Sequence, residues 1–154
     1  MVKGTRMRVL EFFIPSNRRT RKGLPAPLDG LNELIRAEKT DYRFGNRVKR
    51  ENGENAESYC REAMAEQGWK MPSGKATVIL TFVETSRRRD PDNIYGGAKF
   101  ILDGITKRRG LRLYGAGALK DDSQRYVSLM FGDILVDKDN PGCWVRIEAD
   151  EDDV

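Results

Sequence analysis

The chain has 154 residues, a usual size for one domain, and 34% of them are charged against 38% that are hydrophobic. This composition excludes a membrane-embedded protein, and because no signal peptide is recognisable at the N-terminus, we expect a cytoplasmic one. The chain contains no histidine, which excludes Ser-His-Asp and Cys-His catalysis and the common catalytic zinc sites. Any hydrolytic chemistry would therefore depend on carboxylates, lysine and a hard metal ion.

The first half of the chain predicts one strand followed by a long helical region. Residues 7–14 are apolar and rich in strand-forming side chains. A polar loop at residues 17–23 carries four basic side chains. Apolar side chains at helical spacing predict two or more helical segments across residues 28–67, with Asn52-Gly53 as the expected interruption.

The next part of the chain predicts a buried strand and a helix. Residues 75–83 are rich in β-branched and aromatic side chains, which is typical of a strand in the middle of a sheet. A helix is expected to begin at Asp90 or Asp92 and to continue to about Arg109. A glycine-rich loop follows at residues 111–119.

The C-terminal part predicts two strands and an acidic tail. The strands are expected at residues 125–136 and 143–148, joined by a hairpin turn at residues 137–142. The acidic residues 150–154 are expected to be disordered. The predicted fold is therefore α/β of the α+β type: one domain, residues 1–149, in which a mixed sheet of about four strands carries helices on one face.

The charge is unevenly distributed along the chain. Residues 1–50 contain 13 Lys and Arg against 5 Asp and Glu, whereas residues 110–154 contain 5 against 10. A basic first third predicts an anionic partner, with DNA or RNA favoured over a membrane surface. The alternative is an ordinary solvated surface with an acidic tail.

The sequence Asp-Pro-Asp-Asn at residues 90–93 begins the predicted helix and offers two carboxylates. Asp90 before a proline is also a good N-cap, so a purely structural role is an alternative. At 100° per residue, Lys99 and Asp103 lie within about 20° of Asp92, so two carboxylates and a lysine share one polar ridge of the helix. Lys99 and Asp103 could instead be a simple exposed ion pair.

Gly96 and Gly97 lie inside the same helix, and Gly96 is close to the polar ridge. A glycine in a helix interior costs roughly 1 kcal/mol relative to alanine, so the pair calls for an explanation. A close approach by another backbone, such as that of DNA, is one explanation. A helix kink or a late helix start is the other.

Asp121 and Asp122 form a second acidic group, just before a predicted strand. Two adjacent acids in a loop can serve solubility alone. A cluster of carboxylates is nevertheless suited to Mg²⁺, which prefers oxygen ligands, stabilises charge on a phosphate and lowers the pKa of an attacking water. A nearby lysine can stabilise the transition state of phosphodiester hydrolysis.

Three motifs occur in a fixed order: Arg-Asp-Pro-Asp-Asn at 89–93, Lys-Phe-Ile-Leu-Asp-Gly-Ile at 99–105 and Lys-Asp-Asp-Ser-Gln at 120–124. Together with Ile-Pro-Ser-Asn-Arg at 14–18, they resemble the RusA family of Holliday junction resolvases. The resemblance covers most of the chain. It implies a RusA-like homodimer with a mixed sheet, one acidic metal site in each subunit, and paired cuts across a four-way DNA junction.

The resemblance also implies roles for individual residues. The catalytic residues would be Asp90, Asp92, Lys99 and Asp122. The metal, Mg²⁺ with Mn²⁺ as an alternative, would be held by Asp90, Asp92 and Asp122, with Asp103 as a further candidate ligand. No small-molecule cofactor is expected. This sequence departs from the family in having a few extra residues between Asp92 and Lys99. They could shift the substrate preference from four-way junctions toward other branched DNA.

Two basic segments are candidates for binding DNA phosphates. They comprise Arg18, Arg19, Arg21 and Lys22 in the first loop, and Arg87, Arg88 and Arg89 beside the acids. Alternatively, the first set is simply a solvated polar loop, and the second set balances the charge of the nearby acids. The sequence thus predicts a metal-dependent endonuclease for branched DNA. A non-catalytic branched-DNA-binding protein with a degenerate metal site, and a general phosphodiesterase or RNase, are competing interpretations.

Overall fold

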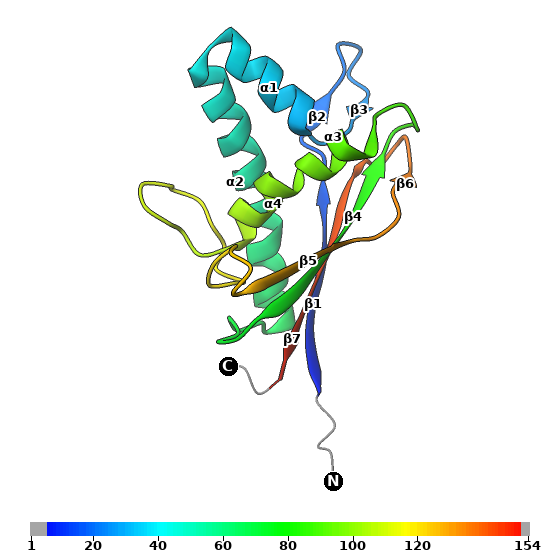
Figure 1. The fold of residues 1–154 in the computed structure, drawn as a ribbon. Coiled ribbons are helices and arrows are strands. Elements are labelled where there is room, and N and C mark those ends of the chain that lie inside the picture. The colour runs from blue at the N-terminus through cyan, green and yellow to red at the C-terminus, as the bar shows by residue number, and fades with distance from the viewer. Residues whose placement is uncertain (1–5, 152–154) are drawn as a thin grey trace.

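The computed structural model describes residues 6–151, which form one mixed sheet with helices packed against it (Figure 1). Residues 1–5 and 152–154 lie outside this description. The sheet has the strand order β1 (Met7–Pro15), β7 (Gly142–Asp150), β4 (Ala76–Glu84) and β5 (Val127–Phe131), and the two-residue β6 (Leu135–Val136) pairs with the end of β4. The α+β class and the mixed sheet predicted from the sequence are confirmed.

The last strand, β7, lies at a different place in the sheet from the one predicted. β7 pairs antiparallel with β1 on one side and with β4 on the other, whereas β5 and β6 pair parallel with β4. The hairpin expected across residues 137–142 is therefore wrong, because β4 lies between the two segments that it would join. This segment crosses the end of β4 instead.

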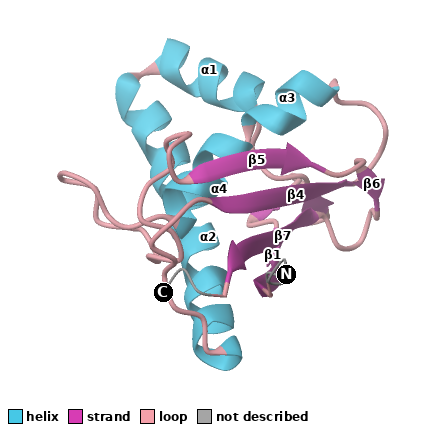
Figure 2. Ribbon diagram, turned by 60° about the horizontal axis from the view of Figure 1, so that its bottom comes forward, coloured by secondary structure: helices cyan, strands magenta, loops and turns pink. Residues whose placement is uncertain are grey.

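In the described residues, 6–151, the helices lie on one face of the sheet, as expected (Figure 2). They are α1 (Leu31–Thr40), α2 (Tyr42–Gln67), α3 (Pro91–Gly96) and α4 (Ala98–Ile105). Helix α1 packs on α2 and α3. A separate two-stranded hairpin, β2 (Arg18–Arg19) with β3 (Pro25–Ala26), carries the first basic loop. None of the helices within residues 6–151 has both the length and the apolar content needed to cross a bilayer.

The core lies between the helices and the covered face of the sheet. Leu10, Leu80, Val145 and Ile147 are fully buried there, since alternate residues of neighbouring strands point to the same face. On the open face, the rings of Phe13 and Trp144 pack with their centroids 4.9 Å apart. Arg146 on the same face pairs with Glu11 and Glu148.

Two expected helix boundaries are corrected. The break in the 28–67 region falls at Asp41, whose side chain caps α2 by accepting from the Arg43 amide, and not at Asn52-Gly53. Asn52 is buried in α2, where its amide donates to Asp29 (2.7 Å). The helix expected to reach Arg109 ends at Ile105, because Thr106 adopts an extended backbone.

The acidic tail begins later than expected. Asp150 is the last residue of β7, and the backbone N–H of Glu151 donates to the carbonyl of Arg6 (2.9 Å). The first two residues of the predicted tail are therefore attached to the sheet. The other three lie outside the described residues.

Candidate metal and nucleic-acid site

The start of α3 presents two carboxylates that the fold does not use. Asp90 occupies the N-cap position of α3, but its side chain accepts no hydrogen bond from the first turn of the helix. The carboxylate therefore does not perform the capping role that was the alternative to metal binding. Asp92 is exposed in the first turn, and its carboxylate has no hydrogen-bond or ion-pair partner within residues 6–151. Both carboxylates are therefore open to a ligand.

Asn93, the last residue of this motif, has a structural role that sequence reasoning missed. Its side chain is buried and joins α3 to α1: Oδ1 accepts from the Asn32 backbone N–H (2.8 Å), and Nδ2 donates to Glu33 (3.4 Å). A buried side-chain amide whose oxygen and nitrogen both form hydrogen bonds holds the elements it joins in a defined orientation. Asn93 thereby sets the direction in which α3 presents Asp90 and Asp92.

The two glycines after this motif are explained by helix packing. A Cβ at Gly96 would lie 2.6 Å from the Cβ of Leu31, and one at Gly97 would lie 2.8 Å from the carbonyl oxygen of Asp29. The backbone that approaches them is thus the start of α1. Of the two explanations offered for the pair, a DNA backbone is not needed at Gly96, because the protein itself fills that space. An interruption of the helix is present, because Gly97 separates α3 from α4.

Asp103 lies near the end of α4 and is the most constrained of the candidate carboxylates. It accepts a hydrogen bond from Arg112 (2.9 Å), so the simple ion pair with Lys99 is not formed. Burial raises the pKa of Asp103, and the charge of Asp122 raises it further, while Arg112 and the exposed Lys99 oppose that shift. The charges of Lys99 and Asp122 therefore both influence Asp103.

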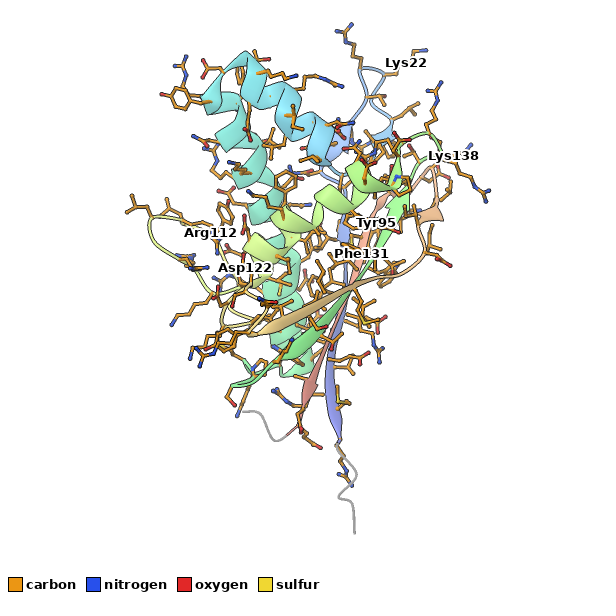
Figure 3. The ribbon with its side chains drawn as sticks, in the orientation of Figure 1. Lys22, Tyr95, Arg112, Asp122, Phe131 and Lys138 are labelled. Carbon is orange, nitrogen blue, oxygen red and sulfur yellow. The ribbon has the colours of Figure 1, made fainter. Side chains whose placement is uncertain are left out.

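Asp121 and Asp122 are held by a single arginine. Arg109 donates to Asp121 (2.8 Å) and to Asp122 (3.4 Å). Figure 3 shows Arg112 and Asp122 near each other beside the lower end of α4. The carboxylates of Asp103 and Asp122 thus share one polar region, in which each is paired with an arginine of the α4–β5 loop.

The candidate acids lie in two groups, one at the start of α3 and one at the end of α4 and in the loop that follows it. Asp90 and Asp92 lie at the start of α3, whereas Asp103 lies near the end of α4 and Asp122 in the loop before β5. Within residues 6–151, no three acidic or cysteine side chains gather as a metal-ligand group. The expected gathering of Asp90, Asp92 and Asp122 is therefore not preformed, and Lys99 lies in the sequence between the two groups.

Two of the arginines predicted to bind DNA are occupied within the protein. Arg89 pairs with Glu84 (2.7 Å) and Glu33 and donates to the carbonyl of Leu28. Arg18 pairs with Asp29 (3.0 Å) and also approaches Glu33. For these two side chains, the geometry favours a structural role over a free phosphate contact.

The other basic candidates remain accessible. Arg21, Lys22, Arg87 and Arg88 are exposed, and their side chains make no hydrogen bond or ion pair with any residue in the 6–151 range. Within the described part of the chain, the Arg19 side chain donates only to the carbonyl of Gly23 (2.9 Å). These side chains can contact phosphates without breaking an internal interaction.

Comparison with known proteins gives no match: no model of a known protein family fits this chain, and neither a curated protein nor a solved structure is significantly similar to it.

Proposed function

We propose that this protein is a metal-dependent endodeoxyribonuclease of the cytoplasm that cuts branched DNA, such as a four-way Holliday junction, by phosphodiester hydrolysis. The observation that carries the proposal is the polar region at the end of α4. There Asp103 pairs with Arg112 and Asp122 pairs with Arg109, two arginines of one loop. Lys99 lies one helical turn before Asp103 on α4. Without histidine, this is the kind of group that phosphodiester hydrolysis requires.

The donor set suits Mg²⁺ or Mn²⁺. All candidate ligands are carboxylate oxygens, and Mg²⁺ is usually held by one or two carboxylates together with waters and substrate phosphate. Asp103 and Asp122 would hold a metal at one end of the segment, and the unpaired Asp90 and Asp92 at the other. When bound, the metal would polarise the phosphate and lower the pKa of a water. No small-molecule cofactor is needed.

The side chains around these acids would handle the DNA. Lys99 is exposed and can donate to a phosphate oxygen in the transition state. Arg109 and Arg112 hold the carboxylates in the DNA-free protein. A DNA phosphate is a competing partner for both guanidiniums, so substrate binding would release carboxylate oxygens to a metal.

The decisive experiment incubates the protein with four-way, flap and linear duplex DNA, with and without Mg²⁺. We expect cutting of branched DNA only when the metal is present. Cutting of RNA or of every DNA alike would favour a general phosphodiesterase or RNase.

The second candidate is a non-catalytic protein that binds branched DNA. It is favoured by the pairing of Asp103 with Arg112 and of Asp122 with Arg109, which leaves no preformed three-acid group in residues 6–151. Tight junction binding without cutting in either Mg²⁺ or Mn²⁺ would support it.

DNA binding is expected to depend strongly on salt. Each phosphate contact releases counterions, so the affinity should fall at least tenfold as salt rises from about 50 to 200 mM. Replacing Arg87 and Arg88 with alanine should weaken the binding and make it less dependent on salt. Gel shifts across a salt series measure both effects, and an affinity that ignores salt would contradict this prediction.

The protein is expected to be a homodimer. Symmetric cutting of a two-fold junction needs two sites, and a closed two-fold dimer supplies them. Light scattering at micromolar concentration, with and without junction DNA, measures the mass directly. A monomer under both conditions would refute paired cutting by a dimer while leaving single cuts possible.

A further inference from the structure

The loop between α4 and β5 carries two leucines that the proposed function has not used. Leu111 is 98% exposed and Leu113 is 80% exposed, the two highest values among the large hydrophobic side chains in residues 6–151. In Figure 1 this loop stands out from the body of the protein beside α2. Exposing two leucines to water forgoes their burial energy, so a partner surface is the natural explanation.

The loop is firmly attached at its base. Tyr114 packs so closely on α2 that a Cβ at Gly53 would overlap its ring, and the N–H of Gly115 donates to Glu57. At the other end, the N–H of Lys107 donates to the carbonyl of Leu119 (2.9 Å). The leucines are therefore held out by a braced loop.

The turn at the tip determines which side chains point outward. The N–H of Arg112 donates to the carbonyl of Arg109 (3.1 Å), and Gly110 takes the positive φ of 56° that this turn requires. Arg112 turns back onto Asp103, which leaves Leu111 and Leu113 on the outer side. The tip of the loop is thus apolar, and the residues that connect it to α4 are basic.

We propose that Leu111 and Leu113 form an apolar wedge that enters the opening at a DNA branch point and packs on the bases exposed there. This inference rests on the proposed function. A branch point exposes base-pair faces that a linear duplex keeps stacked, and apolar side chains inserted between base steps stabilise such openings. The wedge therefore supplies a preference for branched DNA that phosphate contacts cannot supply.

Two features select DNA as the partner of this loop. Its exposed basic side chains, Lys107 and Arg108, precede the leucines and suit an anionic backbone, and Arg108 also pairs with Glu57 (3.7 Å). Two other arginines of the loop, Arg109 and Arg112, contact Asp122 and Asp103, respectively. A wedge placed in a branch point would therefore bring the candidate acids to the phosphates next to it.

The test compares a double variant, Leu111→Ser with Leu113→Ser, against a control, Leu24→Ser. Leu24 is also exposed (59%) in a basic loop, close to Lys22, which Figure 3 places well away from Arg112 and Asp122. Affinities for a four-way junction and a linear duplex are measured by gel shift in EDTA, which prevents cutting. 2-Aminopurine at the branch point reports unstacking through its fluorescence.

The double variant should lose about tenfold or more of its preference for the junction, because the leucines lose apolar contact with bases. Its affinity for linear duplex and its melting temperature should stay unchanged, and the 2-aminopurine signal should disappear. The Leu24→Ser protein should behave as wild type. A double variant that keeps the junction preference overturns the wedge alone, whereas a wild-type protein without that preference overturns the proposed function as well. Leucine-dependent binding to anionic lipid vesicles, with DNA binding unaffected, would assign the loop to a membrane surface instead.

Discussion

Replacing Asp92 with asparagine should abolish cutting of a four-way junction and leave its binding intact. The change removes a negative charge that a metal requires and preserves the shape of the side chain. Because Asp92 has no partner within residues 6–151, the fold loses no interaction. We expect the cleavage rate to fall by about a hundredfold or more, as when other groups that stabilise transition-state charge are removed. Asp90→Asn should behave in the same way.

Of the two acids that pair with arginines, Asp103 should respond differently from Asp90 and Asp92. Asp122→Asn should also abolish cutting, but Asp103→Asn additionally leaves the half-buried Arg112 without its carboxylate. The Asp103 variant should therefore lose thermal stability as well as activity, since a guanidinium without its partner is costly when part-buried. Lys99→Ala should reduce the cleavage rate without lowering metal affinity, because lysine is not a metal ligand.

A matched control separates these effects from a general change in charge. Asp133 is exposed between β5 and β6, and its side chain has no partner in the described part of the chain. Asp133→Asn should cut and bind as wild type. The measurements are single-turnover cleavage rates and gel-shift affinities on one junction substrate. Near wild-type cutting by Asp90→Asn and Asp92→Asn would exclude a metal at the start of α3. Near wild-type cutting by Asp122→Asn as well would eliminate the mechanism, because the chain has no histidine to replace these acids.

The parts of the fold that follow from local patterns could be predicted. The apolar and strand-forming side chains of β1 and the β-branched run in β4 predict both strands, with ends that differ by about one residue from the observed ones. Strand pairing could not be predicted in the same way. Residues 137–142 have the composition of a hairpin turn, yet β7 is apolar enough on one side to lie between two strands, and only the tertiary fold decides that.

At the candidate site, too, the sequence does not reveal which tertiary contacts a glycine or a polar side chain makes. The sequence indicates that Gly96 needs a close neighbour, but tertiary contacts decide whether that neighbour is DNA or α1. Asn93 carries no local signal for its bond to α1. Likewise, the three consecutive arginines 87–89 look alike in the sequence, whereas in the structure only Arg89 turns inward.

The inward position of Arg89 leads to a second prediction with a large effect: Arg89→Met should strongly destabilise the fold. Glu84, at the end of β4, is 2% exposed, and Arg89 is the only cation with which it pairs among residues 6–151. Burial alone would lower the pKa of Arg89, but Glu84 and Glu33 outweigh it and raise that pKa. Removing one partner of a buried pair leaves an uncompensated charge, which costs about 3–5 kcal/mol. Chemical denaturation should show a loss of this size.

Two controls distinguish this pairing from simple packing. Arg87→Met alters the same type of side chain two residues away, at an exposed position without a partner in the described range, and should leave the stability within about 0.5 kcal/mol of wild type. Adding Glu84→Gln to Arg89→Met should recover part of the loss, because a neutral amide is less costly to bury than a carboxylate.

The pH dependence supplies an independent measurement of the same network. Burial would raise the pKa of Glu33, but the charge of Arg89 and the Gly30 amide lower it below the ordinary 4.5. A carboxylate with a lowered pKa stabilises the fold above its unfolded pKa and loses that contribution as the pH falls through the folded value. The stability difference between wild type and Arg89→Met should therefore be full at pH 7 and shrink below about pH 4.5. If the difference were the same at both pH values, Arg89 would act through its hydrocarbon contacts, and its charge would again be available for DNA.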